Sequence, residues 1–176
     1  MNLWLRFLRV VMAAFLSRQR LAPEAVSALT MRVWPTDLDL NFHMNNGRYL
    51  TLMDLGRIDL LMRAGLARAI LARRWMPVLA DAQIRYRCSL GPFRRFRLET
   101  RITGWNEHSV FIAQRFVIAS GPEAGVLAAQ ASVRAVVLDR GRKVPVAEIF
   151  ALSGIEPAAM DGAGFDPAPW AANSPS

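Results

Sequence analysis

A short polar segment between positions 36 and 49 holds the residue types that could do chemistry. They are Asp37, Asp39, Asn41, His43, Asn45 and Asn46. The segment runs straight into an apolar helical pattern, and the first N–H groups of a helix have no partner within the helix. With the helix dipole, these groups favour a developing negative charge. A carboxylate beside them would supply a base or nucleophile together with an oxyanion hole, the two parts that acyl transfer needs.

Each of these residues also has a purely structural interpretation. Asp37 could form an Asx-turn or pair with a nearby arginine, and Asp39 could be a turn acid in the same way. His43 could bond the loop backbone rather than take part in catalysis. Asn45 and Asn46 could be helix caps, a role compatible with function because a cap fixes the N–H donors in place. The residues alone leave these alternatives open.

The pattern after this segment predicts a long helix from Asn46 to Leu66, without proline or a β-branched run. Apolar residues cover most of its circumference, so we expect it to be enclosed rather than to lie on a surface. Asp54 precedes Arg57 by three positions, the spacing of a helical ion pair.

The region from Pro77 to Arg140 alternates apolar and polar residues with the period of β-strands. Turn-like connections separate the strands and favour an antiparallel meander. A helix covered by such a sheet is an α+β arrangement. Phe111, Val117 and Val136 fall on the second strand faces, and we expect a second copy of the chain to cover them.

The two ends of the chain differ in composition from this domain. Residues 1–22 are predicted to form an amphipathic N-terminal helix, 23–155 the main domain, and 156–176 a flexible tail rich in Pro, Ala and Gly. Positions 1–20 combine Trp, Phe and Leu with Arg6 and Arg9, a pattern that suits a helix lying in a membrane interface. The alternative is a helix packed on the domain or on a partner subunit. We expect that removing residues 1–20 leaves folding intact.

The composition restricts the classes of function. A net charge of +8, nearly all from arginine, favours acidic partners, but no nucleic-acid motif accompanies it, and we expect no nucleic-acid binding. The one cysteine, Cys88, is interpreted as core filler. No Cys/His spacing indicates a zinc site, so we expect no metal and no cofactor.

The stretch DLDLNFHMNNGRYL resembles the signature of 4-hydroxybenzoyl-CoA-thioesterase-like hotdog proteins, an Asp-x-Asp pair followed by His-x-Asn-Asn and a tyrosine. It is most similar to the subgroup typified by thioesterase superfamily member six, which shares the later strand beginning Gly104-Trp105 and reaching Phe111. The resemblance covers roughly positions 29–146. It implies a hotdog fold, an antiparallel sheet wrapped around one long central helix, here with an extra N-terminal helix.

The resemblance also implies the chemistry of an acyl-CoA thioesterase. Asp39 would be the nucleophile or general base, and a backbone N–H near Asn46 would polarise the thioester carbonyl, with His43 as a further catalytic candidate. Asn45 and Asp54 would contact the substrate, and Asp54 also matches the helix acid of another hotdog branch. The chain departs from the pattern at Phe42, where many relatives have glycine, so a tighter or differently shaped loop is expected.

The resemblance further implies a homodimer or homotetramer with active sites between subunits, and CoA only as part of the substrate. We expect a cytoplasmic protein, peripheral to the inner face of a membrane if residues 1–20 bind one. Two rival functions stay open. One is a hotdog dehydratase or hydratase that uses His43, and the other is a non-enzymatic acyl-chain binder at a membrane.

Overall fold

The computed structural model describes residues 3–17, 20–22 and 25–155, and the predicted tail at 156–176 lies outside them. The helices are α1 (Leu3–Leu16), α2 (Asn46–Arg63), α3 (Leu66–Ala72) and α4 (Val146–Leu152), with a 3₁₀ turn η1 (Pro35–Asp37). The strands are β1 (Ser27–Arg32), β2 (Met76–Tyr86), β3 (Arg95–Trp105), β4 (Val110–Ile118), β5 (Leu127–Asp139) and β6 (Arg142–Lys143).

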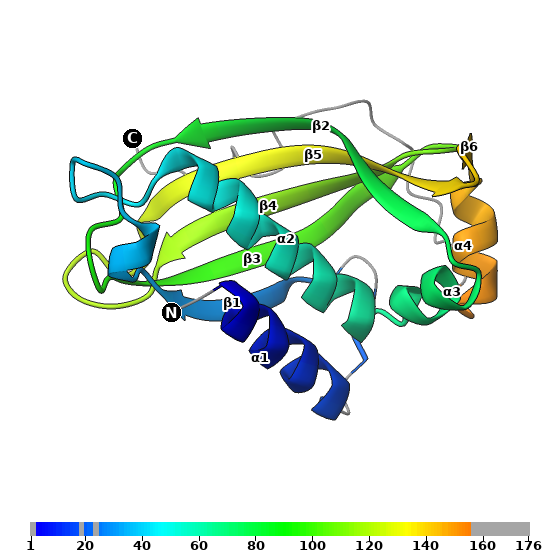
Figure 1. Ribbon diagram of the computed structural model, residues 1–176, viewed down its shortest axis with the longest axis horizontal. Helices are drawn as coiled ribbons and strands as arrows, with labels where there is room; N and C mark the ends of the chain where they lie inside the picture. The colour runs from blue at the N-terminus through cyan, green and yellow to red at the C-terminus, as the bar shows by residue number, and fades with distance from the viewer. Residues whose placement is uncertain (1–2, 18–19, 23–24, 156–176) are drawn as a thin grey trace.

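One antiparallel sheet carries the fold, with strand order β1-β3-β4-β5-β2 and the short β6 paired to β5. Helix α2 lies across one face of this curved sheet, α1 runs beside it near β1, and α3 and α4 lie at one end (Figure 1). The hotdog architecture expected from the resemblance, including the N-terminal helix, is confirmed. Helices α3 and α4 were not predicted.

The expected meander is correct only for β3, β4 and β5. Strand β2 pairs with β5 and not with β3, so β1 and β2 are the two edges of the five-strand path. The chain crosses from one edge toward the other through residues 87–94, where Leu90 is fully buried and its carbonyl accepts the N–H of Met44. A buried residue inside a loop has no periodicity that the sequence could reveal, which is why the crossover was missed.

Helix α2 begins where it was predicted to begin and ends three residues early. The Asn45 side chain accepts the N–H of Gly47 at 2.8 Å, which confirms its role as the N-cap. Gly65 follows the helix with a φ of 80°, a conformation that glycine takes without steric cost and that ends the helix.

The face of α2 toward the sheet forms the core, but the helix is not enclosed on all sides as expected. Leu52, Met53 and Leu60 are fully buried. On the outer side Leu50 is 40% exposed and Asp54 is exposed. Gly56 marks the closest approach to the sheet, because a Cβ there would lie 2.4 Å from the Thr100 hydroxyl oxygen.

Helix α1 packs on the domain through one row of side chains and leaves large apolar side chains on its outer side. Its inward row holds Arg6, Val10 and Ala14, all buried. Its outward side exposes large apolar side chains, among them Trp4 at 74% and Phe15 at 78%. The sequence analysis assigned Arg6 and Arg9 the same role in an interfacial helix, whereas the structure separates them, because Arg6 is only 3% exposed and Arg9 is exposed. None of the described helices is long and apolar enough to cross a membrane.

The apolar residues that were expected to face a second copy are not exposed in the single chain. Phe111, Val117 and Val136 are buried within the single chain. Exposed apolar side chains occur instead on the edge strand β2, where Met76 is 59% and Leu79 is 41% exposed.

Candidate active site

The polar segment folds into a tight hairpin that leads into α2. Leu38 and Met44 pair as an antiparallel bridge, and the Asp39 N–H donates to the His43 carbonyl at 2.8 Å. Phe42 stands at the turn with a φ of 58°. This is the left-handed region that glycine favours. Phe42, where the sequence departs from the family pattern, therefore has a backbone conformation that residues other than glycine rarely adopt.

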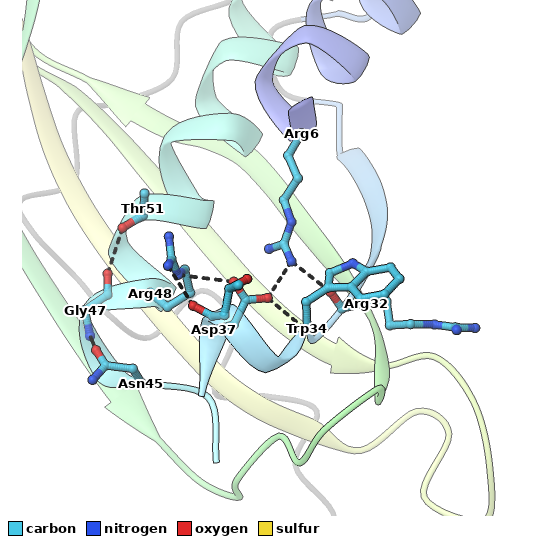
Figure 2. A network of polar contacts seen from close by, with 9 residues as sticks. Arg6, Arg32, Trp34, Asp37, Asn45, Gly47, Arg48 and Thr51 are labelled. Atoms are coloured by element: carbon cyan, nitrogen blue, oxygen red, sulfur yellow. Dashed lines mark hydrogen bonds and ion pairs between the residues drawn. The ribbon is translucent and has the colours of Figure 1, made fainter. Parts of the chain in front are cut away.

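Asp37 is a structural anchor. It is 2% exposed and forms ion pairs with Arg6 from α1 and with the Nε of Arg48, the latter at 3.2 Å. Its carboxylate also accepts the Trp34 N–H at 2.9 Å, and its carbonyl accepts the Asn45 N–H at 2.8 Å. Figure 2 shows the carboxylate held between the two guanidinium groups. Of the two interpretations for Asp37, the arginine pair is confirmed.

Asp39 has a different environment from Asp37. Its Oδ1 accepts the N–H groups of Asn41 at 2.9 Å and of His43 at 3.2 Å, so the backbone of the hairpin fixes the carboxylate. No partner for Oδ2 is present in the described part of the chain, and the residue is only partly buried. The carboxylate is thus oriented by two donors and retains one oxygen for a ligand.

The start of α2 leaves one backbone donor unused. The Asn45 side chain takes the Gly47 N–H, and the Asn45 carbonyl takes the Arg48 N–H at 2.8 Å. The Asn46 N–H at the exposed helix start finds no acceptor among the residues described. Such a donor at a helix N-terminus is suited to an oxyanion. Tyr86 donates its hydroxyl to the Asn46 carbonyl at 3.3 Å, which ties β2 to this point.

Neither the His43 side chain nor Asp54, both within the described residues, forms a hydrogen bond or an ion pair with Asp39 or the Asn46 N–H. The imidazole of His43 is exposed, and only its backbone contributes to the hairpin. Asp54 forms the i,i+3 ion pair with Arg57 that its spacing predicted. It lies eight positions beyond Asn46, about 12 Å along the helix axis. A single chain therefore keeps the Asp39 hairpin and Asp54 apart.

An apolar cavity of about 340 Å³ lies between α2, the sheet and the ends of α3 and α4, with Asp54 and Arg57 as the charged residues of its wall. The apolar part of the wall comes from Ile58, Leu61, Leu66, Ile70, Pro77, Val78, Ile102, Val110, Ala135, Val137 and Phe150, among others. The sequence analysis had no signal for this cavity, because its lining comes from elements far apart along the chain.

A buried polar chain supports the charged edge of the cavity. Arg57 donates to Gln114 Oε1 at 2.7 Å, and the Gln114 amide donates to the Met53 carbonyl at 2.9 Å and to Thr100 at 3.0 Å. Burial lowers the pKa of Arg57, and the Asp54 carboxylate opposes that shift. Sequence reasoning missed Gln114, which looks like an ordinary strand residue. In the described ranges no three His, Cys, Asp or Glu side chains converge as a metal site.

Comparison with known proteins identifies the family of the chain. The family model described as the thioesterase-like superfamily matches residues 33–162, most of the chain. The protein THEM6 of Xenopus laevis is 41% identical over 85 residues, which cover 48% of this chain and 41% of that protein. The chain thus spans less than half the length of this curated relative.

Two solved structures share the fold at low sequence identity. The 4-hydroxybenzoyl CoA thioesterase from Pseudomonas sp. strain CBS-3 is 15% identical, with a TM-score of 0.65 over 72% of this chain and 98% of that one. The probable thioesterase YbaW from Escherichia coli is 22% identical, with a TM-score of 0.61 over 71% of this chain and 94% of that one. The chain belongs to the thioesterase-like superfamily of hotdog proteins.

Proposed function

We propose that this protein hydrolyses acyl-CoA-type thioesters with Asp39 as nucleophile or general base and the Asn46 N–H as oxyanion donor. The observation that carries the proposal is the hairpin itself. It orients one carboxylate through two backbone donors, and it leads directly into a helix start whose first N–H has no acceptor among the described residues. Membership of the superfamily supports the reaction class.

In the proposed reaction the free oxygen of Asp39 either attacks the thioester carbon or removes a proton from the attacking water. Negative charge then develops on the carbonyl oxygen, where the Asn46 N–H would stabilise it. Collapse of the tetrahedral intermediate expels the CoA thiolate. The carboxylic acid product forms directly if water attacked, whereas attack by Asp39 leaves a mixed anhydride that water then hydrolyses to the acid and free Asp39. Asp37 takes no direct part, because its carboxylate is already bound by two arginines and one N–H.

The acyl group requires an apolar space, and in one chain the cavity lies toward the far end of α2 from Asp39. We infer a homodimer formed along the exposed edge of β2, since Pro77, Val78 and Leu79 of that strand line the cavity. Two antiparallel copies of β2 would bring the hairpin of one subunit toward the cavity of the other. Asp54 and Arg57 would then contact the substrate from the opposite side.

A thiol-release assay across acyl-CoA chain lengths tests the activity. For Asp39→Asn we expect kcat to fall by roughly 10²–10⁴-fold, the usual cost of losing a positioned base. Asp139→Asn, an exposed acid on β5, is the matched control. If Asp54→Asn is inactive while Asp39→Asn keeps most of its rate, the catalytic carboxylate is on the helix and the assignment to Asp39 is wrong.

The oxyanion donor can be removed by a single substitution. Asn46 is the first residue of α2, where proline is well tolerated, and Asn45 has the extended ψ of 136° that a residue before proline prefers. Asn46→Pro therefore deletes one N–H and keeps the helix. We expect a loss of roughly 10²–10³-fold in kcat, and Asn46→Ala, which keeps the N–H, should retain activity. Equal rates for the two variants would exclude this donor.

A further inference from the structure

We propose that α1 and the edge strand β1 form a binding site for anionic phospholipid, with the headgroup phosphate held in an arginine-lined groove and the outer side of α1 lying in the membrane interface. The proposal does not depend on the thioesterase activity. It rests on three observations: the rows of side chains on α1, the groove beside them, and the charges in that groove.

The outer side of α1 is apolar over its full length. Trp4, Leu8, Met12 and Leu16 follow one another at four-residue spacing and lie on one row of the helix, and each is about half exposed or more. Phe15 stands beside this row at 78% exposure. Water is an unfavourable environment for so much contiguous apolar surface, so the row marks a docking face.

A second row of α1, formed by Leu5, Arg9 and Ala13, separates this exposed apolar row from the buried row that starts at Arg6. Arg9 and Ala13 line a groove of about 600 Å³ between α1 and β1. A ligand in the groove therefore borders the apolar row directly, which is the arrangement that a charged headgroup attached to acyl chains requires.

Four arginines make the lining of the groove positively charged, namely Arg6, Arg9, Arg32 and Arg95. Arg32 and Arg95 are direct cross-strand partners between β1 and β3, where like charges destabilise a sheet. Neither has a carboxylate partner among the described residues. An anion between the two guanidinium groups would relieve their repulsion, and guanidinium matches phosphate geometry.

Arg6 adds a buried donor to the same groove. Its side chain is 3% exposed, and one of its nitrogens binds Asp37 and the Arg32 carbonyl. Its Nε and Nη1 are buried without a hydrogen-bond partner. Buried polar atoms usually have partners, so two unused donors in the wall of an arginine-rich groove point to an anionic ligand.

The charge complementarity favours an anionic lipid surface over a second copy of the chain. A second copy would bring the same four arginines together and would repel this one. An anionic bilayer supplies both phosphate groups and apolar depth, and each arginine near such a surface contributes about 1 kcal/mol, roughly a fivefold gain in partitioning. Interfacial helices of this kind bind with their apolar side at the level of the acyl chains.

The test is flotation of the full chain with vesicles of phosphatidylcholine alone or mixed with phosphatidylglycerol. We expect binding only to the mixed vesicles, weakened by salt. Arg32→Gln with Arg95→Gln should lower the partition coefficient by roughly 30-fold, whereas Arg140→Gln with Arg142→Gln, exposed at the far hairpin, should change it only slightly. Arg6 is left unchanged, because Asp37 depends on it.

A second pair of variants tests the apolar row. Leu16 is 71% and Leu71, on α3, is 75% exposed, so Leu16→Asp and Leu71→Asp are matched in residue type and exposure. Only Leu16→Asp should abolish flotation. The proposal is overturned if vesicles of both compositions bind equally or not at all. It is also overturned if soluble glycerol phosphate binds the groove as tightly as the mixed vesicles bind the protein, or if Leu16→Asp acts only by dissociating an oligomer seen by light scattering.

Discussion

The buried contact between α1 and the site loop yields a sharp prediction about stability. Arg6→Met replaces the guanidinium with an apolar group of similar length and leaves the Asp37 carboxylate buried with Arg48 and the Trp34 N–H. Breaking a buried ion pair from one side typically costs about 3–5 kcal/mol. We expect about 3 kcal/mol, the lower end, because Arg48 still pairs with the carboxylate.

For a chain of this size 1 kcal/mol corresponds to roughly 2–4 °C, so Tm should fall by about 6–12 °C. Thermal unfolding followed by circular dichroism measures the change. Arg9→Met is the matched control, because Arg9 lies on the same helix, is exposed and should shift Tm by no more than about 2 °C. The reasoning would be refuted if Arg6→Met and Arg9→Met gave the same Tm.

The same contact changes the expectation for the whole helix. The sequence suggested that deleting residues 1–20 leaves folding intact, whereas the structure indicates a destabilisation at least as large as that of Arg6→Met. Deletion removes the arginine and also uncovers the surface on which Val10 and Ala14 pack. A double-mutant cycle between Arg6→Met and Asp37→Asn separates the two contributions, because only the charge pair contributes to the coupling energy.

Three further predictions concern the helix, the hairpin and a buried phenol. Gly56→Ala should cost about 1–3 kcal/mol in urea unfolding, because the added Cβ would lie 2.4 Å from the Thr100 hydroxyl. Phe42→Gly should raise the free energy of unfolding by about 0.5–1 kcal/mol, since it relieves a positive φ but frees the unfolded chain; a decrease would show that the ring contributes contacts. Burial raises the pKa of Tyr49 from 10.0 to about 12. Between these values the unfolded chain loses a proton that the folded chain keeps, so the free energy of unfolding should fall as pH rises, and less so in Tyr49→Phe.

The periodic parts of the fold could be predicted from the sequence. The start of α2, its asparagine cap and most of the strand content follow from patterns within a few neighbouring residues. The order of strands could not, since it depends on the crossover at 87–94 and on a buried Leu90 that no local pattern marks. The same holds for the cavity beside Asp54, whose wall exists only after seven elements have packed.

The candidate site, too, could be predicted from the sequence only in part. The sequence singled out the hairpin, and it ranked Asp39 above Asp37 through a family resemblance rather than through chemistry. What distinguishes the two acids physically is a contact across 31 positions of sequence, from Arg6 to Asp37, which the sequence analysis did not predict. No spacing rule predicts a partner so far along the chain.

The two acids of the hairpin have different surroundings, which suit Asp37 to a structural role and Asp39 to the proposed catalytic role. The Asp37 carboxylate is held by Arg6 and Arg48, while its carbonyl accepts the Asn45 N–H and so fixes the residue that caps α2. Asp39 receives two backbone donors on one oxygen and keeps the other available. A carboxylate whose two oxygens are both bound has no free oxygen to accept a proton, but it holds its neighbours in place. A carboxylate with one free oxygen is oriented by its partners and can still accept a proton. The spacing of two residues between the acids therefore buries the Asp37 carboxylate and leaves Asp39 partly exposed. Asp37 fixes the entry to the helix from inside the protein, and Asp39 keeps one oxygen available in the hairpin that leads to the free Asn46 N–H.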